Sequence, residues 1–231
     1  MESVIFSSAT TIARLIKSKE VSALEILEAH IARIEQVNPK INAVVSTVYD
    51  RARTEALSAD KALQENDVVS PLHGVPITIK DSLDTEGVVT TGGTMGRRKF
   101  IPQYDSTVVR RLRSAGAILI GKTNTPELTL AGETENLIYG RTNNPYDLAR
   151  SPGGSSGGAA AIVATGGSPL DMGSDTGGSI RLPSHFCGIV GLKPNSGRVP
   201  RTGHIVPFGL GALDSLTQNG PMARFFSPVA G

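Results

Sequence analysis

Two glycine- and serine-rich segments in the second half of the chain could place a serine nucleophile beside backbone amides. The first is SPGGSSGG at residues 151–158, and the second is GSDTGGS at residues 173–179. The composition of the first segment is typical of a flexible linker. An apolar run, Ala159–Ala164, separates the two segments and is suited to burial. We therefore expect two loops that meet over a sheet, where glycine lets the backbone approach a ligand closely.

Ser179 closes the second segment, and Lys80 is a candidate for the base that it needs. Residues 176–178 are Thr-Gly-Gly, so several backbone N–H groups lie just before Ser179 and can converge as an oxyanion hole. A serine hydroxyl is a weak nucleophile without a neighbouring base. Lys80 ends the apolar run at 74–79, where burial lowers the pKa of a lysine and turns it into a base. The alternative, a solvated ion pair between Lys80 and Asp81, stays open on spacing alone.

Two familiar motifs match the sequence as patterns and fail on their context. Residues 116–123, GAILIGKT, match the phosphate loop of nucleotide-binding proteins, but their four central residues are apolar and predict a strand. Residues 153–157, GGSSG, match the nucleophile elbow, but a loop with two prolines precedes them instead of a buried strand. The four histidines have no metal-binding spacing and Cys187 is the only cysteine, so we expect no metal site.

The composition is ordinary for a globular protein and argues against several classes of partner. The 231 residues carry a net charge of +2, which is too small to indicate binding to nucleic acid or to an anionic membrane. The absence of tryptophan weakens any interpretation based on base stacking. The N-terminus does not resemble a secretory signal, and no stretch of the sequence reads as a transmembrane helix. The single cysteine fits a reducing compartment, and we expect a cytoplasmic protein.

The elements that must position these residues follow an α/β pattern. Residues 1–65 predict a helical region, with a capping box at Ser22–Glu25 and a helix end near Pro39. After Leu72, short apolar or β-branched runs predict strands, and residues 106–114 predict a helix between two of them. The strand runs are 75–79, 88–91, 117–120, 161–163 and 189–192. Strands that alternate with a helix favour parallel pairing. We expect a single domain over residues 1–231.

Eight segments, taken in order along nearly the whole chain, resemble the amidase signature family. They are 73–81 (HGVPITIKD), 121–124 (GKTN), 143–145 (NNP), 152–158 (PGGSSGG), 173–181 (GSDTGGSIR), 186–188 (FCG), 191–194 (GLKP) and 220–224 (GPMAR). The resemblance implies an α/β fold with a mixed central β-sheet, helices on both faces and an N-terminal helical region. Members of the family are considerably longer, so the resemblance also implies that the C-terminal part of the fold is missing from this chain.

The resemblance implies a Ser–cisSer–Lys triad and gives each of its residues a role. Ser179 is the nucleophile that forms the acyl-enzyme, and Lys80 is the base. Ser155 is the bridging serine, and it follows a cis peptide bond from Gly154. The backbone amides implied to bind the oxyanion are those of Thr176, Gly177, Gly178 and Ser179.

Four further residues receive supporting roles from the same resemblance. In fatty acid amide hydrolase-like members a backbone carbonyl helps to hold the substrate or the triad, and its position here matches Thr129. Ser156 is expected to support the triad by hydrogen bonding. Asp175 and Arg181 are expected to fix the loop rather than to take part in the chemistry.

The activity implied is hydrolysis of the C–N bond of a carboxamide, with a small-molecule amide as substrate and no metal or organic cofactor. No nucleic acid or membrane partner is expected, and a homodimer is one option for assembly. Two alternatives stay open: an amidotransferase subunit that releases ammonia from glutamine for tRNA-dependent amidation, and a truncated, inactive fragment. Residues 202–208 (TGHIVPF) look closer to the stand-alone amidases.

Overall fold

The computed structural model describes residues 4–65, 69–205 and 214–226 of the chain. Within these residues the α-helices are α1 (Ala9–Lys17), α2 (Ala23–Ile41), α3 (Tyr49–Gln64), α4 (Thr107–Ser114), α5 (Gly157–Ala164) and α6 (Arg181–Phe186). The strands are β1 (Val44–Thr47), β2 (Pro76–Lys80), β3 (Ile118–Thr123), β4 (Leu170–Asp175), β5 (Val190–Gly191) and β6 (Gln218–Ala223). Two 3-10 helices, η1 (Met95–Arg97) and η2 (Glu127–Thr129), lie in the connections.

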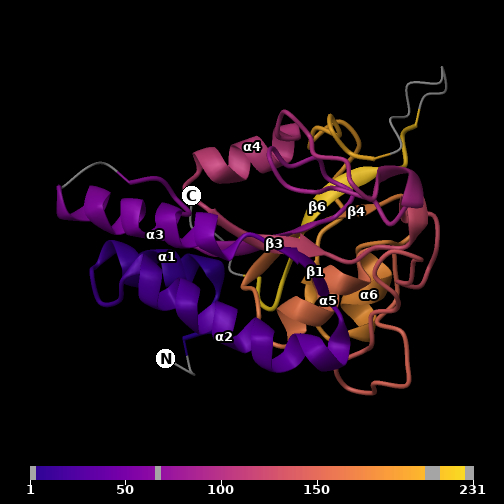
Figure 1. The fold of residues 1–231 in the computed structure, drawn as a ribbon, viewed down its shortest axis with the longest axis horizontal. Coiled ribbons are helices and arrows are strands. Elements are labelled where there is room, and N and C mark those ends of the chain that lie inside the picture. The colour runs from indigo at the N-terminus through magenta and orange to yellow at the C-terminus, as the bar shows by residue number, and fades with distance from the viewer. Residues whose placement is uncertain (1–3, 66–68, 206–213, 227–231) are drawn as a thin grey trace.

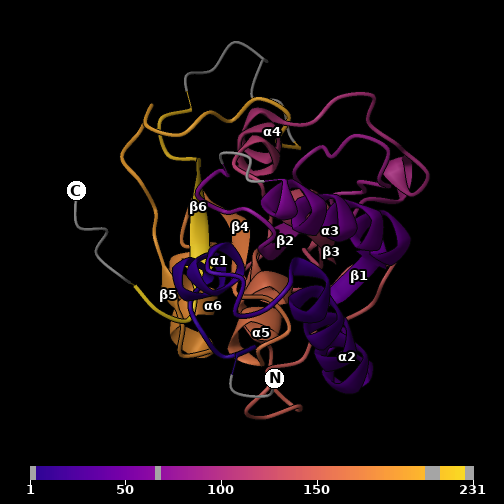
Figure 2. The same cartoon turned by 90° about the vertical axis from the view of Figure 1, so that its left-hand side faces the viewer.

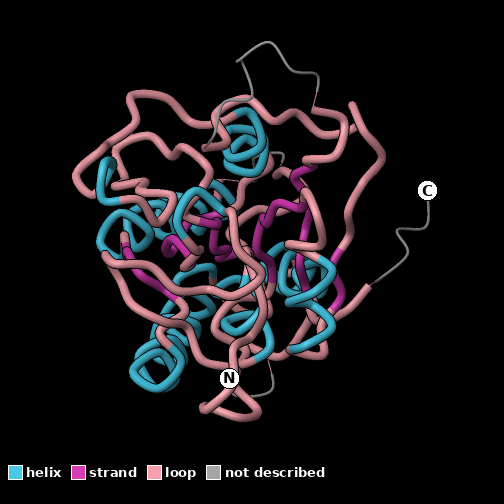
Figure 3. Tube along the Cα trace, turned by 90° about the vertical axis from the view of Figure 1, so that its right-hand side faces the viewer, coloured by secondary structure: helices cyan, strands magenta, loops and turns pink. Residues whose placement is uncertain are grey.

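The strands form one mixed sheet in the order β1-β3-β2-β4-β6-β5. Strand β2 runs parallel to both of its neighbours, β3 and β4, whereas the other pairs are antiparallel. The sheet crosses the middle of the molecule, with α4 on one side and α5 and α6 on the other (Figure 1, Figure 2). Long connecting segments surround the strands (Figure 3). The predicted α/β fold, with a mixed sheet and helices on both faces, is confirmed.

The N-terminal region is mainly helical, and its predicted capping box is confirmed at the start of α2. The Ser22 hydroxyl accepts a hydrogen bond from the Glu25 amide at 3.1 Å, and the Glu25 carboxylate accepts one from the Ser22 amide at 2.8 Å. Helix α2 continues past Pro39 to Ile41. Strand β1 then interrupts the helical region, because its β-branched residues pair with β3 at the edge of the sheet.

Three of the predicted strands and the predicted helix at 106–114 are confirmed as β2, β3, β5 and α4. Because residues 118–123 form β3, the strand interpretation of GAILIGKT is correct and the phosphate loop is excluded. Among the described residues, no helix is long and apolar enough to cross a membrane.

The other two predicted strands, 161–163 and 88–91, are wrong, and two strands of the structure were not predicted. Residues 161–163 belong to helix α5, in which every residue from Gly157 to Val163 is buried. A helix buried on all sides has no amphipathic period, so its short apolar run cannot be distinguished from that of a buried strand. Residues 88–91 form no strand. Strands β4 (LDMGSD) and β6 (QNGPMA) are not predicted, because glycine, proline and polar residues weaken the strand signal.

Candidate active site

Lys80 is the last residue of β2 and ends in a cluster of three serine hydroxyls. The whole strand is buried between β3 and β4, and Lys80 itself has no exposed surface. Its Nζ lies 2.6 Å from the hydroxyl of Ser155 and 2.9 Å from those of Ser156 and Ser174. Ser155 and Ser156 immediately precede α5, and Ser174 lies in β4. The sheet and the helix start therefore bring these four side chains to one point.

Burial sets the protonation state of this lysine. It lowers the pKa of Lys80 to about 7, although the negative charges of Asp171 and Asp175 act in the opposite direction. A group with this pKa is neutral in about half of the molecules at pH 7. The solvated ion pair with Asp81 is excluded, because both side chains are fully buried. Lys80 can thus accept a proton near neutral pH.

A second buried lysine, Lys122 on β3, shows how the partners of the two lysines differ. Burial lowers the pKa of Lys122 to about 8. Its Nζ donates to the backbone carbonyl of Leu83 and to the hydroxyls of Thr85 and Thr90. The Thr85 and Thr90 hydroxyls donate their own hydrogens to the carbonyls of Leu83 and Val88, so none of these groups can donate to Lys122. The Ser155 hydroxyl, in contrast, has no partner but Lys80 among the described residues. Of the two, Lys80 is therefore arranged for proton exchange.

The backbone that carries Ser155 is held tightly from outside. The expected cis peptide bond between Gly154 and Ser155 is present. A Cβ atom at Gly154 would lie 2.6 Å from the carbonyl oxygen of Glu133, so only glycine fits there. The Thr134 hydroxyl donates to the carbonyl of Gly153 at 2.9 Å and accepts from the amide of Gly157 at 3.1 Å. Thr134 therefore holds both ends of the segment from Gly153 to Gly157. No pattern in the sequence indicates this role.

The loop that carries Ser179 is organised by Asp175. The carboxylate of Asp175 accepts hydrogen bonds from the amides of Gly178 and Ile180 and from the guanidinium of Arg181, all at 2.9 to 3.0 Å. Burial acts to raise the pKa of Asp175, but these hydrogen bonds outweigh it and hold the pKa below its usual range. The predicted role of Asp175 and Arg181 in fixing the loop is confirmed.

Ser179 meets the first glycine-rich segment through its backbone. Its carbonyl accepts a hydrogen bond from the amide of Ser156 at 3.2 Å, so the predicted meeting of the two segments is confirmed. Its side chain is half-buried, whereas Ser155 is only 1% exposed. Within the described residues, the Ser179 hydroxyl makes no hydrogen bond to Lys80 or Ser155. The nucleophile candidate therefore stands at the solvent side of the cluster, where a substrate can reach it.

The expected oxyanion donors divide into free and occupied amides. The Gly178 amide donates to Asp175 at 2.9 Å, and its expected role as an oxyanion donor stays a prediction. Among the described residues, the amides of Gly177 and Ser179 have no acceptor. Thr176 is exposed, and its hydroxyl pairs with that of Thr217 at 2.7 Å.

Thr129 lies in the connection between β3 and α5. It occupies the end of η2 with a left-handed φ of 63°, and its amide donates to the carbonyl of Pro126 at 3.0 Å. No hydrogen bond joins it to Lys80, Ser155 or Ser179 within the described part of the chain. The structure thus leaves its predicted contact with substrate or triad as a prediction.

Ser174 and His204 belong to the cluster, although the sequence alone gives neither of them a role there. The Nε2 atom of His204 lies 2.8 Å from the Ser174 hydroxyl and 3.1 Å from the Ser82 hydroxyl. His204 reaches the cluster because the backbone of its neighbour Ile205 donates to the Ser82 carbonyl at 2.7 Å. These contacts join residues far apart in the chain, so no local pattern could have identified them.

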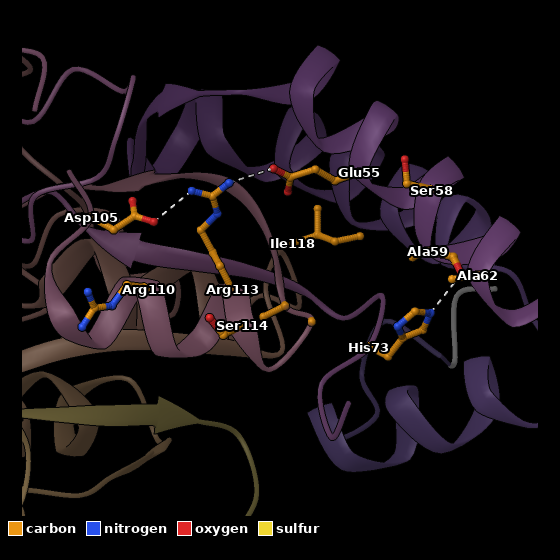
Figure 4. A pocket seen from close by; sticks show the side chains of 12 residues that line it. Glu55, Ser58, Ala59, Ala62, His73, Asp105, Arg110, Arg113, Ser114 and Ile118 are labelled. Carbon is orange, nitrogen blue, oxygen red and sulfur yellow. Dashed lines mark hydrogen bonds and ion pairs between the residues drawn. The ribbon is translucent and has the colours of Figure 1, made fainter. Parts of the chain in front are cut away.

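Figure 4 shows a surface pocket of about 510 Å³ between α3 and α4, and none of the triad candidates lines it. Three of its charged groups pair with one another: Arg113 contacts Asp105 at 2.9 Å and Glu55 at 3.3 Å. His73 contacts the carbonyl of Ala59 at 2.9 Å. In the described residues, no group of three or more His, Cys, Asp or Glu side chains could hold a metal ion. The serine–lysine cluster is therefore the candidate active site.

Comparisons with known proteins agree on one family. The sequence model of the Amidase family matches residues 25–230. The A subunit of glutamyl-tRNA(Gln) amidotransferase from Sulfurihydrogenibium sp. (strain YO3AOP1) is 48% identical over 216 residues, which are 94% of this chain and 44% of that protein. The structure of fatty acid amide hydrolase matches with a TM-score of 0.91 at 33% identity, over 96% of this chain and 39% of that one. Peptide amidase from Stenotrophomonas maltophilia matches with a TM-score of 0.87 at 33% identity, over 94% of this chain and 45% of that one.

The chain spans less than half the length of each of these relatives. The expectation that family members are considerably longer is therefore confirmed. The family match covers most of the chain and includes every residue of the serine–lysine cluster. The chain belongs to the Amidase family, as its resemblance to the amidase signature enzymes implied.

Proposed function

We propose that this chain hydrolyses the C–N bond of a small carboxamide through a triad of Ser179, Ser155 and Lys80. The observation that carries the proposal is the fully buried Lys80, with its Nζ 2.6 Å from the Ser155 hydroxyl. A lysine in this setting is a base near neutral pH, which a serine nucleophile requires. Membership of the Amidase family supports the same reaction class.

The proton transfers follow the order of the three side chains. Neutral Lys80 accepts the proton of the Ser155 hydroxyl, and Ser155 in turn accepts the proton of Ser179. The Ser179 oxygen attacks the amide carbonyl carbon and forms a tetrahedral intermediate. The same two groups return a proton to the leaving nitrogen as the C–N bond breaks, which leaves an acyl-enzyme on Ser179. Water then takes the place of the amine and releases the acid.

Backbone amides of the Ser179 loop stabilise the charge that develops on the substrate oxygen. We assign this role to the amides of Gly177 and Ser179, together with that of Thr176, which precedes Gly177 in the chain. The Asp175 carboxylate fixes the loop by accepting from the Gly178 and Ile180 amides, so these donors need little reorganisation during the reaction. We assign the carbonyl of Thr129 to substrate binding, on the resemblance to fatty acid amide hydrolase-like members.

An amide-hydrolysis assay tests this proposal directly. The purified chain is incubated with a panel of primary, aryl and peptide amides, and released ammonia or amine is measured. Replacing Ser179 or Ser155 by alanine is expected to lower the rate by about a thousandfold or more. The matched control is Ser58→Ala, at an exposed serine on α3, which keeps the wild-type rate. Equal rates in all four proteins would refute the triad, and no hydrolysis at all would support the inactive-fragment alternative.

A second candidate function is that of an amidotransferase component. The relatives with 46–48% identity are named as the A subunit of glutamyl-tRNA(Gln) amidotransferase, so glutamine is a candidate substrate and further subunits are candidate partners. The same triad would then release ammonia from the glutamine side chain. Glutaminase activity that rises when the partner subunits and charged tRNA are added would favour this candidate. Hydrolysis of other amides without such a rise would favour the stand-alone amidase.

We place either reaction in the cytoplasm. The support is the single cysteine, Cys187, which is buried and fits a reducing compartment. Burial also raises the pKa of the Cys187 thiol to about 12, so this side chain is a packing residue and no rival nucleophile.

A further inference from the structure

The three hydroxyls around Lys80 cannot all make the same kind of hydrogen bond when the lysine is neutral. A neutral amine has two N–H donors and one lone pair, so two of the hydroxyls accept a hydrogen bond from Nζ and one donates to it. The proposed reaction requires that the donating hydroxyl is that of Ser155. The hydrogens of Ser156 and Ser174 must therefore be directed elsewhere.

Ser156 has a backbone partner for its hydrogen. Its hydroxyl donates to the carbonyl of Ser174 at 3.2 Å and accepts from the amide of the same residue at 3.3 Å. Strand β4 thus fixes the orientation of this hydroxyl. Its remaining lone pair faces the Nζ of Lys80 at 2.9 Å.

Ser174 has a side-chain partner instead. Besides Lys80, its hydroxyl contacts the Nε2 atom of His204 at 2.8 Å. His204 is buried, and this burial lowers its pKa to about 3, with the positive charge of Lys80 acting in the same direction. The imidazole is therefore neutral, and with its proton on Nδ1 the Nε2 atom can accept the Ser174 hydrogen. Ser155 differs from both other serines, because its hydroxyl contacts only Lys80 among the described residues.

We infer that His204 is a positioning residue: it accepts the hydrogen of Ser174, so that Ser174 accepts from Lys80 and the lone pair of Lys80 stays open to Ser155. The inference rests on the proposed function, because it assigns a task within the same proton path. His204 does not touch the reacting atoms. It acts through Ser174, and its own place is fixed by the contact of the neighbouring backbone with Ser82.

Removal of the imidazole acceptor is expected to lower two quantities, the maximal rate of Ser179 acylation and the pKa of Lys80. The hydrogen of Ser174 turns towards the lone pair of Lys80 and competes with Ser155, so the maximal rate of Ser179 acylation falls by about tenfold. The protonated form of Lys80 loses stability, because Ser174 then has no acceptor for its hydrogen. The pKa of Lys80 falls as a result, by about one unit for one lost hydrogen bond beside a charge. Removal of a residue that only fills space would lower the stability of the protein and leave the pKa of Lys80 unchanged.

The charged groups that act on this cluster come from several elements. Lys80 itself lies on β2, and Asp171 and Asp175 lie on β4. Arg201 and Asp214 act on His204 from the segments around it, with opposite signs. All five stay unchanged in the variants below, so a moved titration reports on the His204 side chain.

The test compares His204→Leu with His204→Gln, whose amide oxygen can still accept the Ser174 hydrogen. The control is His30→Leu, at a fully buried histidine of α2 whose Nδ1 lies 3.1 Å from the Gly166 carbonyl, with no contact to Lys80. In the whole chain, the pKa of Lys80 is read from the lysine ¹³Cε shift during a pH titration. The rate of fluorophosphonate labelling at Ser179 is measured over the same pH range.

We expect His204→Leu to lower the Lys80 midpoint by about one unit and the maximal labelling rate by about tenfold. His204→Gln should recover most of both, and His30→Leu should change neither. If His204→Leu leaves both values at those of the wild type, or if His204→Gln matches it in both losses, the inference is overturned. If the Lys80 midpoint moves as expected but wild-type Ser179 is never labelled, the proposed function fails and the link from His204 to Lys80 stands.

Discussion

Replacing Lys80 by methionine should change how the stability of the protein depends on pH. Burial lowers the pKa of Lys80 from 10.5 to about 7 in the folded protein. Between these two values the unfolded chain holds one more proton at this position than the folded chain does. The free energy of unfolding of the wild type therefore rises with pH in that window, by about 1.4 kcal/mol per pH unit. The stability lost by burying this lysine is greatest below pH 7 and is regained as the pH approaches 10.5.

The magnitude follows from the width of the window that is measured. From about pH 7.5 to about pH 9.5, the wild type should gain about 2.5 kcal/mol of unfolding free energy relative to Lys80→Met. The variant keeps the other titrating groups, including Lys122, so the difference between the two proteins isolates Lys80. Methionine has a similar length and no charge, which limits the change in packing.

Urea denaturation followed by circular dichroism measures this difference at several pH values. A difference between wild type and Lys80→Met that stays constant within about 0.5 kcal/mol over this window would refute the reasoning. Such a result would mean that Lys80 keeps an ordinary pKa and is protonated at neutral pH. It could then not act as the base.

Three further predictions concern the reaction and the two glycine-rich segments. The rate of Ser179 acylation should rise with pH through a midpoint near 7, because only neutral Lys80 accepts a proton. A rate that still rises tenfold per pH unit up to about pH 9 would contradict this assignment of the base. Gly154→Ala should lose about 2 kcal/mol of stability, since its Cβ would lie 2.6 Å from the Glu133 carbonyl oxygen. Gly177→Ala, whose Cβ meets no atom within 4 Å, should melt like the wild type, and equal melting of both variants would count against the packing argument. Asp175→Ala should lower the free energy of unfolding by about 2 kcal/mol in chemical denaturation, because the Gly178 and Ile180 amides lose their acceptor. The same variant should slow acylation of Ser179. Unchanged acylation would show that the loop holds its shape without Asp175.

Local patterns in the sequence predicted the parts of the fold that depend on neighbours in the chain. The capping box at Ser22 and the strand that ends at Lys80 both follow from a few adjacent residues. The two glycine-rich segments meet as expected, since the Ser156 amide reaches the Ser179 carbonyl. Family resemblance added the cis peptide bond before Ser155, which no spacing rule could supply.

Other features depend on contacts between distant parts of the chain and were therefore beyond the sequence. Helix α5 is buried on every side, so its alanine-rich run carries no period that separates helix from strand. The hydrogen bond from the Gly178 amide depends on where the Asp175 carboxylate lies. The roles of Ser174 and His204 follow from one contact of 2.8 Å between side chains of different segments. The direction of each hydrogen bond in the serine–lysine cluster follows only from the positions of all of its side chains.

Covalent labelling with a fluorophosphonate, followed by mass mapping of the modified residue, tests the proposed triad most directly. We predict that the label lies on Ser179 in the wild type and in Ser58→Ala, and that Lys80→Met abolishes it. A label on Ser155, or a label on Ser179 that persists unchanged without Lys80, would contradict the roles assigned to the three residues.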